Sequence, residues 1–96
     1  MKLTTIVINE KDNVATCLIE RDAGDNADFT IGGKVNQVAV LEPIPFGHKI
    51  AVRSLEAGEQ VIKYGEVIGV ASRSIKAGQH VHVHNVESIR ARGDKS

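Results

Sequence analysis

The chain has 96 residues, of which 42% are hydrophobic and only 3% aromatic, so it can form one small domain with an aliphatic core. Twelve basic residues balance twelve acidic ones, which argues against a nucleic acid or an anionic membrane as the main partner because both require a basic face. We recognise no signal peptide, no long apolar run and a single cysteine, Cys17, and therefore expect a cytoplasmic protein.

The first half of the chain predicts short strands, because Val, Ile and Thr recur in runs separated by polar turns. Four such runs are residues 2–8, 14–19, 29–31 and 35–41. The last two flank Gly32-Gly33 and predict a strand pair, whereas the polar residues 21–28 predict a mobile loop. Cys17 lies inside an apolar run, so we expect a buried and unreactive thiol.

The second half contains a repeat. Residues 53–61 align with residues 73–81, and residues 44–50 form a shorter copy. Each copy has Gly at a fixed distance between two aliphatic residues, which predicts a turn that needs a positive φ. No segment shows a long helical period. We therefore expect an all-β domain of short, folded-back strands over residues 1–88, followed by a polar tail over residues 89–96.

The most informative segment is His80-Val81-His82-Val83-His84. In a continuous strand Val81 and Val83 would enter the core, and the three imidazoles would share the opposite, more accessible face. Same-face neighbours lie about 6.6 Å apart and the outer pair about 13 Å apart. His82 and His84 could therefore share a metal ion, and a third ligand would come from elsewhere. The alternative is an exposed strand face on which histidine is tolerated.

Two turns carry further candidates. His48 follows Gly47, where a ligand can approach the backbone; the alternative is a surface histidine. Lys63 and Tyr64 precede Gly65, and the alternative for Tyr64 is that its ring packs on the protein while its hydroxyl is solvated or hydrogen-bonded.

Several of these segments together resemble a known family. They are residues 47–51 (GHKIA), 61–65 (VIKYG), 68–69 and 77–85 (AGQHVHVHN). This set resembles the SAF-type domain of altronate and galactarate dehydratases and is also similar to the small subunit of sulfolactate sulfo-lyase. The resemblance covers about residues 12–85, although residues 21–40 match poorly. It implies a β-clip fold and a larger catalytic partner, either a separate large subunit or a C-terminal domain.

The resemblance also implies a reaction, the β-elimination of water from a sugar acid such as altronate. Such a reaction needs a base, an acid and positive charge near the substrate carboxylate. The candidate catalytic residues are His48, Lys63 and His84; the candidate substrate-binding residues are Lys49, Tyr64 and Asn85; the candidate metal ligands are His82 and His84. The alternatives are sulfolactate as the substrate, or a non-catalytic carbohydrate-binding module, which has no need of the histidine segment.

A divalent cation, Fe²⁺ or Mn²⁺, is implied for the complete enzyme. Two imidazoles without a carboxylate form an incomplete site, so we expect the isolated chain to bind metal loosely or not at all and to be inactive. The sequence leaves the substrate, the metal and the formation of a homo-oligomer open.

Overall fold

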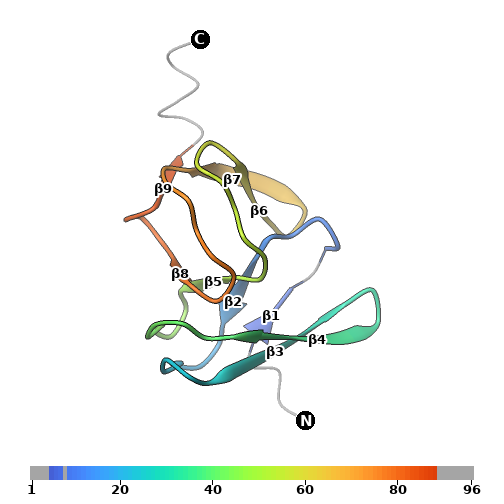
Figure 1. The fold of residues 1–96 in the computed structure, drawn as a ribbon. Helices are drawn as coiled ribbons and strands as arrows, with labels where there is room; N and C mark the ends of the chain where they lie inside the picture. The colour runs from blue at the N-terminus through green and yellow to red at the C-terminus, as the bar shows by residue number, and fades with distance from the viewer. Residues whose placement is uncertain (1–4, 8, 89–96) are drawn as a thin grey trace.

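The computed structural model describes residues 5–7 and 9–88, and this part of the chain contains strands and turns but no helix (Figure 1). The strands are β1 (Thr5–Ile6), β2 (Val14–Cys17), β3 (Asn26–Ile31), β4 (Lys34–Ala39), β5 (Lys49–Ala51), β6 (Gln60–Lys63), β7 (Glu66–Ala71), β8 (His80–Val81) and β9 (Val86–Ser88). The prediction of an all-β domain of short strands is confirmed. The predicted polar tail and parts of the first predicted strand lie outside the described residues. The described part of the chain offers no helix with the length and hydrophobicity needed to span a membrane.

The strands form three antiparallel sheets, with β1-β2-β5-β8 in the middle, the β3-β4 hairpin on one side and β6-β7-β9 on the other (Figure 1). Side chains of the central sheet alternate between two cores, as the twofold period of a strand requires. Ala15 and Ile50 enter the core shared with the β3-β4 hairpin. Val14 and Ala51 enter the core shared with β6 and β7. The central sheet is thus covered on both faces.

The described residues contain four tight turns of one kind, at residues 22–25, 45–48, 56–59 and 76–79. In each turn the backbone N–H of the fourth residue donates to the carbonyl of the first. The third residue is always Gly, with φ values of 96°, 82°, 90° and 95°, which a residue with a Cβ rarely adopts. The predicted Gly turns are therefore confirmed, and a fourth copy begins at residue 22.

This fourth copy changes the interpretation of residues 21–28, which were predicted to form a mobile loop. Residues 22–25 form the first tight turn, and Asn26–Asp28 already belong to β3. Polar composition suggested a loop, but the Asp25 side chain closes the turn on the backbone of Asp22, and the exposed polar positions of β3 alternate with buried Ala27 and Phe29.

Cys17 is fully buried, as predicted. Burial raises the pKa of its thiol, against a smaller opposing effect of the Arg21 charge and a hydrogen bond from Thr5. The thiolate, which is the reactive form, is therefore disfavoured at this position.

Candidate functional site

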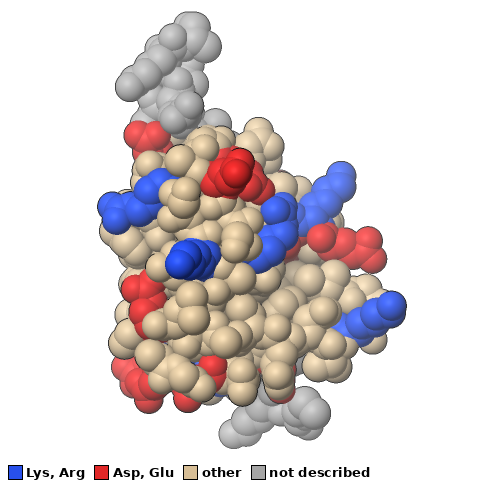
Figure 2. All heavy atoms as spheres, in the orientation of Figure 1, with Lys and Arg blue, Asp and Glu red and all other residues tan. Residues whose placement is uncertain are grey.

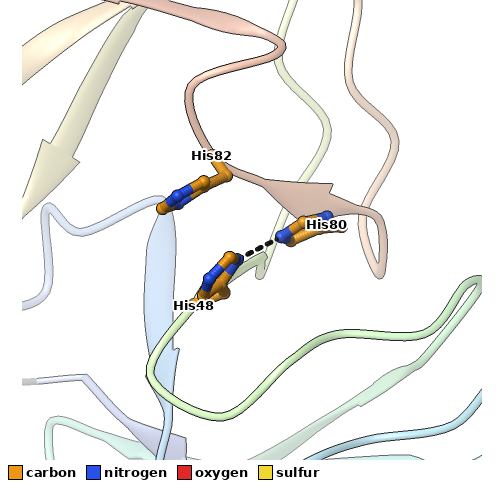
Figure 3. A group of neighbouring side chains, drawn as sticks. All are labelled: His48, His80 and His82. Carbon is orange, nitrogen blue, oxygen red and sulfur yellow. Dashed lines mark hydrogen bonds between the residues drawn. The ribbon is translucent and has the colours of Figure 1, made fainter.

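Pairing of β5 with β8 brings His48 together with His80 and His82, which follow more than 30 residues later in the sequence (Figure 3). Ile50 lies opposite His80 and Lys49 opposite Val81, so His48 and His82 are the next residues of the two segments beyond this pairing. The rings of His48 and His82 stack at 3.8 Å between centroids. Nδ1 of His48 forms a hydrogen bond of 2.8 Å with Nε2 of His80. We call His48, His80 and His82 the histidine triad.

The predicted continuous strand through residue 84 is wrong. Strand β8 ends at Val81, and residues 82–85 form a turn. Val81 is fully buried as expected, but Val83 is 81% exposed rather than buried. His84 is exposed as well, and the turn brings its ring to 4.8 Å from that of His80, so the three alternating histidines do not share one flat strand face.

Asn85 explains why the strand stops. Its Oδ1 accepts a hydrogen bond of 3.0 Å from the His82 N–H, and its Nδ2 donates one of 2.8 Å to the His80 carbonyl. Such side-chain bonds to the local backbone compete with strand pairing. Asn85 is only 5% exposed, so the structure shows it holding the turn that carries His82, and its predicted contact with a substrate stays a prediction.

The structure groups the potential metal ligands differently from the alternating sequence pattern. One potential ligand atom from each member of the histidine triad lies within 4.8 Å of the others. His84 is outside this group, so the structure gathers His82 with His48 and His80, and metal binding by the pair of His82 and His84 stays a prediction. The turn at residue 82, which a period-two pattern does not reveal, is the reason for the different grouping.

Turn chemistry explains why the His48 ring is available. In three of the tight turns the fourth side chain accepts a hydrogen bond from the N–H of the first residue. These residues are Asp25, Glu59 and Gln79, at 2.8, 3.1 and 2.7 Å. In the second turn the first residue is Pro45, which has no N–H to donate. The fourth residue, His48, has no such role and its ring turns toward His80 and His82.

A second group lies beside the triad. Lys49 pairs across the sheet with Thr16, whose hydroxyl is 3.3 Å from that of Tyr64. The ammonium of Lys63 lies 4.9 Å from the centre of the Tyr64 ring. Burial and the charge of Lys63 lower the pKa of Lys49. The predicted residues Lys49, Lys63 and Tyr64 are therefore brought together.

Tyr64 has a strained backbone. It occupies the two-residue loop of the β6-β7 hairpin with Gly65, and both have positive φ, 55° and 79°. This loop normally takes Asn, Asp or Gly, and a bulky side chain in this region costs roughly 1–2 kcal/mol. Strain at an exposed aromatic residue is an indication of function. In the sequence, the sign of this strain is Tyr64 directly before Gly65, where such a loop normally begins with Asn, Asp or Gly.

The candidate residues line two different cavities. A cavity of about 210 Å³ is lined by Lys49, Ile68, His82, Val83, Val86 and Ser88, so one triad member and one lysine share it. Another, of about 150 Å³, is lined by Glu42, Arg73, Ser74, Gln79, His84 and Asn85. His82 and His84 thus face different cavities.

The environment favours the neutral imidazole at two members of the triad, His80 and His82. Burial lowers the pKa of His80, and the neighbouring histidines lower it further, while Glu42 acts in the opposite direction. Burial and the charges of His48, Lys49 and His84 lower the pKa of His82. Neutral rings can accept a proton or coordinate a metal ion.

Comparison with known proteins places this site in a family. Residues 3–89 match the family described as the altronate/galactarate dehydratase SAF domain. The chain is 52% identical over 54 residues to (2R)-sulfolactate sulfo-lyase subunit alpha of Chromohalobacter salexigens, covering 56% of this chain and 57% of that protein. It is 42% identical over 66 residues to the protein of the same name from Paracoccus pantotrophus, covering 69% and 88%.

A longer relative is altronate dehydratase of Bacillus subtilis, with 35% identity over 83 residues, which are 86% of this chain but 16% of that protein. The chain therefore spans a little over half of the first sulfo-lyase subunit and a small part of the dehydratase. The match over residues 3–89 shows that the chain belongs to the altronate/galactarate dehydratase SAF domain family.

Proposed function

We propose that this chain is the small component of a lyase that acts on a hydroxylated carboxylic acid by β-elimination. It contributes imidazole and ammonium groups to a site that a larger subunit or domain completes. Family membership supports the lyase class. The convergence of His48, Lys49, Lys63, Tyr64 and His82 at one end of the central sheet is the observation that carries the proposal.

The convergence is specific because three separate segments supply the groups. The start of β5 and the turn before it supply His48 and Lys49, the β6-β7 hairpin supplies Lys63 and Tyr64, and the turn after β8 supplies His82. A domain that only packs against a partner does not need two lysines close enough for one to lower the pKa of the other. Basic and acidic side chains are interspersed over the face in Figure 2, so this face is not an extended basic surface. The neighbouring Lys49 and Lys63 therefore suit a small anion.

The proposed roles follow from these positions. A neutral imidazole of the triad removes the proton next to the substrate carboxylate, and the electron pair forms the C=C bond as the leaving group departs. Lys49 and Lys63 stabilise the negative charge that develops on the carboxylate oxygens. When the leaving group is hydroxide, a protonated imidazole or Tyr64 donates the proton that makes water. A divalent cation, where bound, stabilises the same negative charge as a Lewis acid.

The first candidate substrate is a sugar acid of the altronate type, which loses water. The second is sulfolactate, which loses sulfite and needs no proton on the leaving group. The higher identity to proteins named sulfolactate sulfo-lyase subunit alpha, 52% and 42% against 35%, supports this second candidate. A protein named subunit alpha has a partner, and the dehydratases carry the matching segment within a longer chain, so a large partner is part of the proposal.

The test is co-expression of this chain with a large lyase component, which we expect a neighbouring gene to encode, followed by purification of the complex. Altronate, galactarate and sulfolactate are offered, and 2-oxo acid formation and sulfite release are measured. We expect one of these acids to be converted by the complex and none by the isolated chain. No conversion by a correctly assembled complex would overturn the proposal.

Variants of the complex distinguish the effect of losing a charge or a side chain at the site from an effect on the fold. Lys63→Met should lower kcat/KM strongly, whereas Lys34→Met, a matched change in an exposed lysine at the start of β4, should leave it unchanged. Tyr64→Asn should relieve the backbone strain at the hairpin and so stabilise the chain by about 1 kcal/mol, yet reduce activity. Full activity in both Lys63→Met and Tyr64→Asn would contradict the proposed site.

A further inference from the structure

We propose that the histidine triad binds one divalent transition-metal ion, of the zinc, cobalt or nickel type, within this chain alone and without the large component. Three imidazoles are supplied by two segments that the β5-β8 pairing fixes side by side. One potential ligand atom from each ring lies within 4.8 Å of the others. The inference concerns this chain's own residues and stands independently of the reaction proposed above.

The spacing of the triad is close to that of an occupied site. Tetrahedral ligands with bonds of roughly 2.0–2.1 Å lie about 3.3 Å apart. One pair of ring nitrogens, Nδ1 of His48 and Nε2 of His80, is 2.8 Å apart, and 4.8 Å is the upper bound of the set. Binding therefore needs only small shifts of the rings toward a spacing of about 3.3 Å, which ring rotation can provide.

The backbone around the triad is already fixed. His80 is held in β8, where its N–H also donates to Glu42 at 3.0 Å. His82 is held by the Asn85 side chain at 3.0 Å, and His48 by the hydrogen bond that closes its turn to Pro45 at 3.0 Å. Ligands that are held in place before binding lose less conformational entropy when the ion arrives.

One buried ring nitrogen of the triad has no hydrogen-bond partner in the described part of the chain. This atom is Nδ1 of His82. A buried polar nitrogen without a partner is costly, and coordination or a coordinated water would satisfy it. The observation is independent of the distances within the triad.

The donor set decides the class of metal. Three neutral imidazoles suit zinc, copper, nickel or iron, whereas magnesium and calcium prefer oxygen ligands. The triad contains no carboxylate, and the Lys49 charge lies near His82, so we expect moderate rather than very tight affinity. Three protein ligands leave a coordination position open, which is typical of catalytic rather than structural sites.

The test is titration of the chelator-treated isolated chain with Co²⁺ and Zn²⁺, followed by ligand-field absorption and calorimetry. We expect one ion per chain and no competition from Mg²⁺. His48→Ala, His80→Ala and His82→Ala should each weaken binding by more than the roughly 10–100-fold typical of losing a residue that hydrogen-bonds to a metal ligand. His84→Ala is the matched control and should bind normally.

Circular dichroism of each variant shows whether it has folded. If the triad variants unfold, the ¹⁵N chemical shifts of the imidazoles in the unmodified chain still test the proposal. On addition of Zn²⁺, the shifts of His48, His80 and His82 should change and that of His84 should not. Absence of a saturable Co²⁺ or Zn²⁺ signal would overturn the proposal. Loss of binding in His84→Ala with retention in His80→Ala would overturn it as well, in favour of the pair of His82 and His84.

Discussion

Asn85→Ala should destabilise the domain although Asn85 contributes no apolar surface to either core. The substitution removes the acceptor for the His82 N–H and the donor to the His80 carbonyl, two bonds of 3.0 and 2.8 Å. Both backbone groups then lie in a partly buried turn without a side-chain partner. The turn that carries His82 loses the contact that ended β8.

The size of the effect follows from those two groups. A buried donor or acceptor that loses its partner costs about 1–3 kcal/mol. His80 and His82 are only partly buried, so water can reach their backbone and the lower end of this range applies to each. The sum is about 2 kcal/mol, a substantial part of the roughly 5–15 kcal/mol that stabilises a typical domain.

Urea unfolding followed by circular dichroism measures this change. With a slope of about 1–3 kcal/mol per molar urea, the midpoint should fall by about 1 M. The control is Asn36→Ala, which removes an exposed local bond to the Lys34 carbonyl and should change stability by less than about 0.5 kcal/mol. Equal midpoints for Asn85→Ala and Asn36→Ala would refute the reasoning. Asn85→Ala should also weaken Co²⁺ binding, since it loosens His82.

Three further outcomes can be checked on the isolated chain. Gly58→Ala should cost about 1–3 kcal/mol from φ strain alone, whereas Gly78→Ala should cost more because its Cβ would also collide with the β4 backbone; equal urea midpoints would contradict this. Cys17 should resist a thiol reagent at neutral pH until denaturant is added, and rapid labelling of the native chain would show that it is not buried. Without metal, stability should be highest above the ordinary histidine pKa of 6.5 and fall as the pH drops, because the folded-state pKa of His80 and His82 is lowered and the unfolded chain takes up more protons. Replacing His80 and His82 with Gln should flatten this slope, and an unchanged slope would assign it to other groups.

The sequence predicted the fold well where local rules dominate. Gly at a fixed distance between aliphatic residues predicted the tight turns, because only a positive φ explains a Gly repeated at that place. Alternation with Gly32-Gly33 predicted the β3-β4 hairpin. The turn at residues 22–25 was missed because its first flanking residue is Arg21 rather than an aliphatic residue, so it did not match the repeat.

The sequence named most of the candidate residues that the structure brings together, but it did not give their arrangement. Lys49, Lys63, Tyr64, His48 and His82 were all named, but their grouping depends on the pairing of strands far apart in the sequence. The alternation at residues 80–84 was extended too far, because a period-two pattern does not show that the Asn85 amide competes for the strand's hydrogen bonds. His80 was therefore set aside as a ligand, although its register opposite Ile50 places it beside His48.

The turn that contains Pro45 has the same backbone shape as its three copies, but its fourth side chain takes no part in holding the turn. In this scaffold the groups that determine the shape of a turn are therefore not the group that is available for chemistry. The Gly and the backbone bond determine the shape of every corner, while the side chain at the fourth place is needed only where the first residue has an N–H to satisfy. A proline at the first place therefore makes the fourth place open to any residue at little structural cost. Lys76→Pro together with Gln79→His would repeat this exchange at the last corner. New reactive groups can thus be introduced at a corner by two substitutions, without redesign of the sheets.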